Sequence, residues 1–331
     1  MPTQSEALES VHRSLAELPR GRWLLAVSGG RDSMALLDAF ASARGHEVAG
    51  VASFDHGTGP AARKAVALVE RTGLALQLPV MTGRMQPAVG HAKLAAHSVD
   101  EAAWREARWR FLDGWAAELR ATVVTAHSWD DQVETVVLRL LRGSGPRGLA
   151  GMRVADATGN AEHAGASTRI ARPFLTLRRD QIAAYATARR LQWVVDPSNA
   201  TLAFGRNRVR HEILPALERA SPGFAQWCWD LSGRAAAWRQ TLATWVDAQL
   251  APVLIDADRV AVRAAAMRTF DATGGAVIWP EVAARVGLAM DRRGIARVVA
   301  WAPTAKSGGR VQLSRGEVLC TASTFVIRRL Y

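Results

Sequence analysis

A phosphate-binding turn is predicted near the start of the chain, in the run Val27-Ser28-Gly29-Gly30-Arg31-Asp32-Ser33. A strand predicted over 23–28 leads into the glycines, and a helix predicted over 33–44 follows them. The glycines let the backbone bend tightly, so that several N–H groups point at one spot. A helix N-terminus facing such a turn binds anions, and a Cβ at Gly29 or Gly30 would hold a phosphate away. The run contains neither a Walker A loop nor the Gly-x-Gly-x-x-Gly dinucleotide turn.

A second group of reactive side chains follows a strand predicted over 121–126. His127, Asp131 and Glu134 fall at i, i+4 and i+7, so they line one helix face if the helix begins early. Carboxylates at this place bind magnesium through oxygen ligands or hold an ammonium group of a substrate. Capping of the helix by Asp130 and Asp131 explains one or two acids, but not a histidine and three acids together. We therefore expect a site here.

Polar side chains also end the strand predicted over 47–54. Asp55 and His56 would lie beside the glycine turn, where an adenosine can be held, although His56 can equally be a turn residue that caps the next helix. Arg105 and Arg108 share one face of a following helix. Their guanidinium groups either form a solvated, salt-bridged face or neutralise charge that develops on a leaving pyrophosphate.

Basic segments follow these motifs. A glycine-rich loop that includes Arg142 and Arg147 is predicted either as a second anion-binding loop or as a flexible connector. Arg206, Arg208 and Arg210 stand within five residues at the start of another helix. This arrangement suits contacts with phosphate groups.

The elements that position these residues alternate between strand and helix, which predicts an α/β fold with a doubly wound parallel sheet. In such a sheet the strands end at one edge, and ligands collect there. A smaller α+β domain is predicted at the carboxyl end, with a hairpin over 308–329. The expected division is a catalytic domain over 1–220, a helical linker over 221–250 and the small domain over 251–331. The predicted strands are 23–28, 47–54, 74–80, 121–126 and 193–195, a loop is expected over 81–97, and the predicted helices are 5–18, 33–44, 61–72, 99–119 and 178–190.

Composition narrows the class of protein. The chain has 331 residues, 49% of them apolar, so it can bury the cores of two domains. Its formal net charge of +12 indicates an anionic partner larger than a nucleotide. The alternative is an arginine-rich composition that reflects a high-GC genome. Two isolated cysteines, Cys228 and Cys320, argue against a disulfide framework, a zinc site and an iron–sulfur cluster. Without an apolar leader or spanning segment, we expect a cytoplasmic protein with no membrane partner.

The ordered set of motifs resembles the tRNA(Ile)-lysidine synthetase family, within the N-type ATP pyrophosphatases, over residues 20–220. The fold that this resemblance implies is that of the adenine nucleotide alpha hydrolases. The motifs that carry it are Ser28–Ser33, Asp55–Gly57, Glu101–Arg108, His127–Thr135, Arg142–Met152, Arg172–Pro173, Asp196–Asn199 and Arg206–Arg210.

The resemblance implies a ligase that modifies the wobble cytidine of an isoleucine tRNA with a CAU anticodon. ATP adenylates the C2 oxygen of this cytidine and releases pyrophosphate, and the side-chain amine of free L-lysine then displaces AMP to leave lysidine. The turn at 28–33 would cradle the phosphates of ATP, with Asp32 placed for Mg²⁺. A base in an anticodon loop must be splayed out before an enzyme can reach it, and a single-stranded loop permits this.

The resemblance also implies roles for the other candidates. Asp131 and Glu134 would bind the ammonium groups of lysine, and either Arg105 or Arg108 would stabilise the adenylation transition state. Arg208 would hold lysine, with the phosphate backbone of tRNA as the alternative. The residues expected to contact tRNA are Arg142, Arg147, Arg206 and Arg210.

Two departures from the family pattern concern the nucleotide side of the site and its neighbour. Thr58-Gly59-Pro60 stands where the family usually carries a leucine and an arginine, and Ser128-Trp129 is unusual within the second motif. The alternative function is a PP-loop tRNA thiolase that delivers sulfur to an adenylated base, but it would need a reactive cysteine pair or cluster ligands. A homodimer is compatible with the resemblance.

Overall fold

The computed structural model describes residues 2–57, 59–85, 98–156, 168–196 and 205–330. The chain divides into two compact units, the first holding the described residues up to Ala235 and the second those from Ala236 onward. The division falls inside the long helix α10 (Phe224–Leu250). The first half of the expected linker helix therefore belongs to the first unit.

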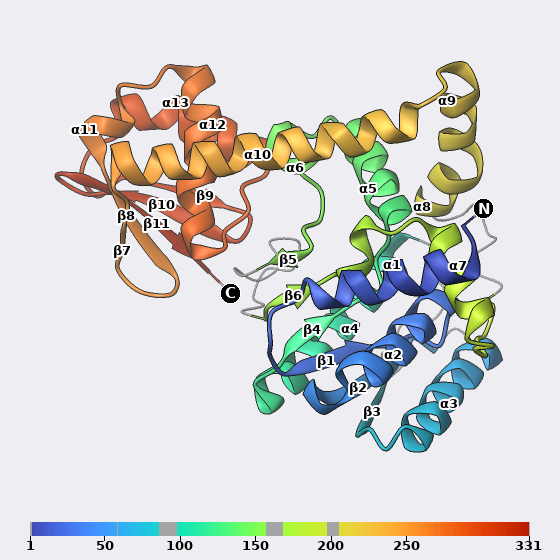
Figure 1. Ribbon diagram of the computed structural model, residues 1–331. Helices are drawn as coiled ribbons and strands as arrows, with labels where there is room; N and C mark the ends of the chain where they lie inside the picture. Colours follow the sequence, from blue (N-terminus) through green and yellow to red (C-terminus); the bar gives the residue numbers. More distant parts are fainter. Residues whose placement is uncertain (1, 58, 86–97, 157–167, 197–204, 331) are drawn as a thin grey trace. The chain divides into compact units, whose positions relative to one another are not determined.

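The first unit is built on a six-stranded sheet with the order β3-β2-β1-β4-β6-β5 (Figure 1). Neighbouring strands run parallel, except that β5 pairs antiparallel to β6. The predicted doubly wound α/β fold is confirmed. The order reverses at β1, so the ends of β1 and β4 form the edge where ligands bind in such sheets. The strands are β1 (Trp23–Ala26), β2 (Val48–Asp55), β3 (Val80–Arg84), β4 (Thr122–Val124), β5 (Ala155–Asp156) and β6 (Ile170–Ala171).

Helices cover both faces of this sheet. Successive strand residues point to opposite faces, and Leu25 therefore packs with α1, α2 and α7, while Leu24 packs with α4. The helices are α1 (Gln4–Ala16), α2 (Arg31–Arg44), α3 (Pro60–Ala75), α4 (Ser98–Leu119), α5 (Trp129–Leu141), α6 (Pro146–Leu149), α7 (Arg179–Ala188), α8 (Gly205–Arg208) and α9 (Leu214–Ala220). Shorter turns lie at Gly45–Glu47, Pro173–Thr176 and, as a π-helical turn between α8 and α9, Val209–Ile213.

Two predicted strands differ from the structure. The strand expected over 74–80 is instead β3 at Val80–Arg84, because α3 continues to Ala75 and Gln77, at φ 56°, makes the turn that follows. The first part of the predicted loop 81–97 is therefore strand, and residues 86–97 lie outside the described residues. The segment 193–195 joins no sheet. The N–H of Val194 instead donates to the carbonyl of Gly29, in the phosphate turn, at 2.9 Å.

The second unit is a five-stranded antiparallel sheet with the order β7-β8-β11-β10-β9, packed against α12 and α13. The predicted carboxyl-terminal hairpin is confirmed by the pairing of β9, β10 and β11. Its elements are β7 (Val253–Leu254), β8 (Arg259–Arg263), α11 (Ala264–Met267), α12 (Ala272–Ala283), α13 (Arg292–Trp301), β9 (Arg310–Leu313), β10 (Gly316–Cys320) and β11 (Thr324–Arg329), with 3-10 turns at Ala284–Val286 and Ala302–Thr304. None of the helices within the described ranges is long and apolar enough to cross a membrane.

Candidate active site at the carboxyl ends of β1 and β4

The predicted phosphate turn joins β1 to α2. Gly29 has φ +79°, and a Cβ built there would lie 2.8 Å from both the Cβ and the carbonyl oxygen of Ala65. The hydroxyl of Ser33 accepts from the N–H of Ser28 at 3.2 Å and donates to the carbonyl of Gly30 at 2.9 Å, which fixes the turn. Gly30 is the N-cap residue of α2, and no side chain caps the helix there. The first N–H groups of the helix therefore remain available to an anion.

Asp32 projects from the first turn of α2 between two arginines. Its Oδ1 lies 3.0 Å from Nε of Arg31, and its Oδ2 lies 4.0 Å from Nε of Arg179. Burial raises the pKa of Asp32, and the charges of Arg31 and Arg179 act against this rise. No group of three or more ligating side chains occurs in the described part of the chain. Asp32 fits Mg²⁺ as a single carboxylate that acts together with phosphate oxygens, the pattern usual for this ion.

The carboxylates of Asp131 and Glu134 meet on α5, surrounded by three guanidinium groups. The Glu134 side chain is 1% exposed and lies 3.2 Å from Arg179, 3.1 Å from Arg206 and 2.7 Å from Arg210. Oδ1 of Asp131 lies 3.1 Å from Arg179 and 3.4 Å from Arg210. We call these five residues the carboxylate cluster.

Asp131 both caps its helix and belongs to the cluster. Its Oδ2 accepts from the N–H of Ser128 at 2.8 Å, which completes a capping box, while Oδ1 faces the arginines. The capping interpretation is therefore confirmed, while the role of Asp131 in a site stays a prediction. Burial acts to raise the pKa of Asp131, but the charges of Arg206 and Arg179 and the hydrogen bond from the N–H of Ser128 outweigh it and hold the pKa below its usual range. The carboxylate is thus ionised at neutral pH.

His127 precedes α5 rather than lying on it. Its Nδ1 is 2.8 Å from the hydroxyl of Thr125. Burial lowers the pKa of His127 far below its usual value. The charge of Asp131 acts to raise this pKa, and the charges of Arg172 and Arg206 act to lower it further. The imidazole is therefore neutral, and it is a weak base.

A second, cationic part of the site involves α4 and the end of β2. Burial, with Arg105 and Arg206 nearby, lowers the pKa of Arg108 to about 10, and the buried Nε of Arg108 has no hydrogen-bond partner in the described part. Burial and the charge of Arg108 lower the pKa of His56 to about 4, and its Nδ1 is likewise without a described partner. A buried arginine N–H that lacks a partner and lies near other cations is a group that a bound anion would stabilise.

Asp55 lies at the end of β2 and shapes the turn after it. Its Oδ1 accepts from the N–H of Gly57 at 2.7 Å, and its Oδ2 lies 3.5 Å from Nε of Arg84. The stretch 58–60, which departs from the family pattern, is described in part. Thr58 lies outside the described residues, Gly59 has φ +130° and Pro60 begins α3.

The departure at Ser128-Trp129 has a structural explanation. Ser128 supplies the cap of α5. The Trp129 ring stacks on Trp229 with centroids 5.8 Å apart, and the guanidinium of Arg178 lies 3.8 Å from its centroid. These contacts join α5 to α10 and to the start of α7.

The predicted basic residues do not all reach this site. Arg206 and Arg210, expected on the tRNA, contact the carboxylates, whereas Arg208, expected at lysine, is exposed. Residues four apart share a helix face, so the residue between them faces away. Arg142 is exposed at the end of α5, and Arg147 is half-buried on α6. Their assigned roles stay predictions.

Arg179 is the site residue that the sequence analysis missed. Its backbone N–H donates to Asp130 Oδ2 at 2.7 Å, and its side chain contacts Asp131 and Glu134. One signal was present, because a cation in the first turn of a helix is unfavourable next to the positive end of the dipole. An arginine there indicates a carboxylate partner from elsewhere in the fold.

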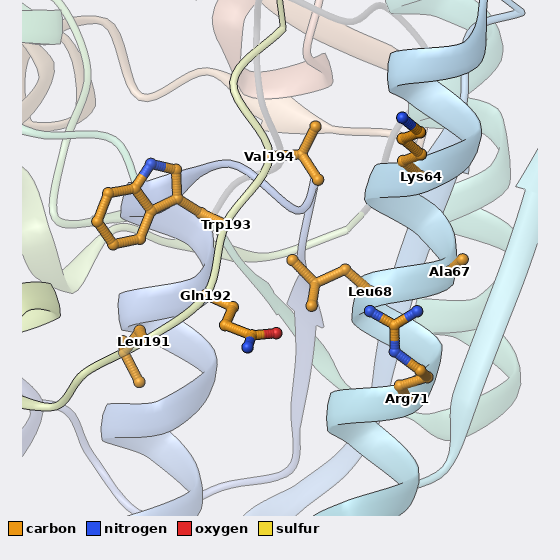
Figure 2. A pocket seen from close by; sticks show the side chains of 8 residues that line it. All are labelled: Lys64, Ala67, Leu68, Arg71, Leu191, Gln192, Trp193 and Val194. Atoms are coloured by element: carbon orange, nitrogen blue, oxygen red, sulfur yellow. The ribbon is translucent and has the colours of Figure 1, made fainter.

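A cavity of about 600 Å³ lies beside the phosphate turn, between α3 and the segment 191–194. Figure 2 shows Lys64, Leu68 and Arg71 on the side of α3 that faces this segment. The segment is tied to the turn by the hydrogen bond from Val194 to Gly29. None of the predicted site residues lines this cavity, so it is distinct from the carboxylate cluster.

Comparison with known proteins identifies the family. A model of an ATP-binding PP-loop domain matches residues 3–217, about two thirds of the chain, with the phosphate turn and the carboxylate cluster inside the match. The chain belongs to this family. It is a PP-loop protein that uses ATP, and members of the family are enzymes.

Similar curated proteins give the PP-loop assignment more detail. The chain is 40% identical over 228 residues to the tRNA(Ile)-lysidine synthase of Salinispora arenicola, an alignment that covers 67% of this chain and 65% of that protein. It is also 40% identical over 227 residues to the tRNA(Ile)-lysidine synthase of Salinispora tropica, covering 66% and 63%. The chain thus spans slightly less than two thirds of the length of these relatives.

One solved structure shows the same fold at low sequence identity. The U34-tRNA thiolase of Methanococcus maripaludis, solved with its 4Fe-4S cluster, superposes with a TM-score of 0.54 at 13% identity, covering 70% of this chain and 79% of that one. At this identity the likeness concerns the fold alone.

Proposed function

We propose that this PP-loop protein joins L-lysine to C2 of the wobble cytidine of a tRNA(Ile) with a CAU anticodon. The observation that carries the proposal is the placement of two carboxylates, Asp131 and Glu134, beside the acid of the phosphate turn, Asp32, with Arg179 between them. The 40% identity to tRNA(Ile)-lysidine synthases supports it. An activating nucleotide and an ammonium substrate are the two ligands that such a site suits.

In the first step, the C2 oxygen of the cytidine attacks the α-phosphate of ATP and pyrophosphate leaves. The N–H groups of the phosphate turn hold the leaving phosphates, and Asp32 would hold Mg²⁺, which neutralises phosphate charge when bound. Arg108, with Arg105 beside it, stabilises the charge that develops during transfer. The unsatisfied Nε of Arg108 supports this role.

In the second step, the side-chain amine of lysine attacks C2 and AMP leaves. Asp131 and Glu134 bind and orient the amino acid through its ammonium charge, and the arginines of the carboxylate cluster hold those two acids in place. A thiolase reaction is disfavoured because Cys228 and Cys320 are both buried and burial raises the pKa of Cys228 to about 11. A buried, protonated thiol does not deliver sulfur.

The second unit is proposed to contact the tRNA backbone. A cavity of about 660 Å³ between α13 and β9 is lined by Arg293, Arg297 and Gln312. The one acid at this cavity, Asp291, caps α13 by accepting from the N–H of Gly294 at 2.6 Å. A net charge of +12 over the whole chain favours association with a polyanion.

The proposal is tested by incubating the protein with ATP, radiolabelled lysine and an unmodified tRNA(Ile) transcript with a CAU anticodon. We expect ATP-dependent label in the RNA and none in a transcript with uridine at the wobble position. Label from sulfide in place of lysine would support a thiolase. If neither label appears while the protein is folded, the proposed function is wrong.

A further inference from the structure

Arg179 connects the two halves of the site. It is the first residue of α7, and its guanidinium lies 4.0 Å from Asp32 on α2, 3.1 Å from Asp131 and 3.2 Å from Glu134 on α5. The hydrogen bond from its backbone N–H to Asp130 fixes the start of α7 against the start of α5. One guanidinium thus contacts acids of the phosphate turn and of the carboxylate cluster.

Both acids of the carboxylate cluster are already paired with guanidinium groups in this state. Glu134 and Asp131 are shared among Arg179, Arg206 and Arg210, and every one of the three arginine side chains is between 24% and 28% exposed. An ammonium group that approaches these acids therefore competes with guanidinium groups for the same oxygens. Lysine binds well only if one of the guanidinium groups gives way.

Arg179 is the member of the cluster placed to do so. A triphosphate on the phosphate turn would bring several negative charges next to Asp32, which Arg179 already approaches. Arg206 also bonds the carbonyl of Asp131 and the hydroxyl of Thr135, both at 3.1 Å, and these bonds hold it at α5. A guanidinium shared between two anionic regions moves toward the one whose charge increases.

We propose that Arg179 is a positioning residue that makes lysine binding depend on ATP, by leaving Asp131 and Glu134 for the triphosphate when the nucleotide binds. This inference rests on the proposed function. It predicts that each ligand strengthens the binding of the other, because coupling between two sites is reciprocal. A residue with a merely structural role would instead weaken the binding of both ligands when replaced.

The test is calorimetric titration of lysine into the full-length protein, with and without a saturating non-hydrolysable ATP analogue. In the wild type we expect the analogue to strengthen lysine binding by roughly fivefold or more. In Arg179→Gln the ratio of the two dissociation constants should approach one, while binding without nucleotide is unchanged or tighter because the acids have lost a competing cation. Arg179→Lys keeps the charge but loses the forked donors, so an intermediate ratio is expected.

Arg189→Gln is the matched control. Arg189 lies at the other end of α7 and pairs with Asp38 on α2 at 2.8 Å, away from the carboxylate cluster. The substitution removes a similar ion pair between α7 and α2. The ratio of the two lysine dissociation constants should stay at the wild-type value.

Four outcomes would overturn the inference. If Arg179→Gln keeps the wild-type ratio, or if Arg179→Gln and Arg179→Lys weaken both ligands equally, Arg179 does not couple the sites. If the folded wild type binds the analogue but not lysine, the proposed function fails and the inference fails with it. A wild type that binds lysine with no help from the nucleotide contradicts the inference alone.

Discussion

The two units of this protein use arginine in opposite ways. In the first unit, the side chains of Arg179, Arg206 and Arg210 are mostly buried and each contacts Glu134. In the second, Arg293 and Arg297 are exposed, and neither has an ion pair or side-chain hydrogen bond within the described residues. The same residue type therefore holds acids in place in the first unit and stays exposed without an ion pair in the second.

The acids explain the difference. In the second unit the described carboxylates are already engaged by arginines or by helix N-termini. No described acid is therefore left to pair with the exposed arginines of α13. These carboxylates are Asp247, Asp256, Asp258, Glu281 and Glu317, which form ion pairs, and Asp271 and Asp291, which cap helices. Buried pairs specify geometry, whereas exposed unpaired cations attract a polyanion at little cost to folding.

The largest effect is expected from breaking the buried half of this comparison. Glu134→Gln removes the charge shared by three arginines and leaves Asp131 as the one acid of the cluster that faces them, which should lower the free energy of unfolding by about 3 kcal/mol. Urea denaturation measures the change. Glu9→Gln breaks the exposed Glu9–Arg13 pair and should change stability by less than about 0.5 kcal/mol. Equal losses in both variants would show that the buried cluster contributes no more to the free energy of unfolding than an exposed ion pair does.

A smaller effect on folding, but a clear one on RNA binding, is expected in the second unit. Arg293→Glu combined with Arg297→Glu should leave stability within about 0.5 kcal/mol of the wild type. The same change should reduce tRNA affinity and lower the slope of log affinity against log salt by roughly 0.9 for each lost phosphate contact. Filter binding over a salt series measures this. Arg259→Gln, at an exposed pair with Asp256, is the control, and an unchanged slope in the double variant would place the RNA elsewhere.

The smallest effect is a pH dependence at the cationic part of the site. The pKa of His56 is lowered from 6.5 to about 4 by burial and by Arg108. Between these values the unfolded chain binds a proton that the folded protein does not, so stability falls as the pH drops through this window. His56→Gln should flatten part of the loss of stability between pH 6.5 and pH 4, and His127 adds to the loss in the same direction. His46→Gln, at an exposed histidine, should leave the loss as it is.

Local patterns in the sequence were enough to predict the parts of the site that single segments build. A strand, a glycine turn and a helix place Asp32, and the carboxyl edge of a parallel sheet brings Asp131 and Glu134 beside it. Arg206 and Arg210, which the sequence assigned to the tRNA, instead contact Glu134 in the structure.

The remaining features depend on packing between distant segments. Arg179 reaches Asp131 across 48 residues of sequence, and no local pattern says which acid α7 will meet. The core face of α4 is formed by Trp109, Leu112 and Ala116, and these residues pack against Leu24, Val123 and Ile170 from distant parts of the chain. The division between the units falls within the continuous helix α10, where composition gives no signal.

The most direct test of the central claim separates the two half-reactions in Asp131→Asn. The asparagine keeps an oxygen that can accept from the N–H of Ser128 and cap α5, but it loses the charge that faces the arginines and the substrate. With the tRNA(Ile) transcript we predict a pyrophosphate burst like that of the wild type and a loss of lysine incorporation of about tenfold or more. Unchanged lysine incorporation, or equal losses in both half-reactions, would contradict the assignment of the carboxylate cluster to the amino acid.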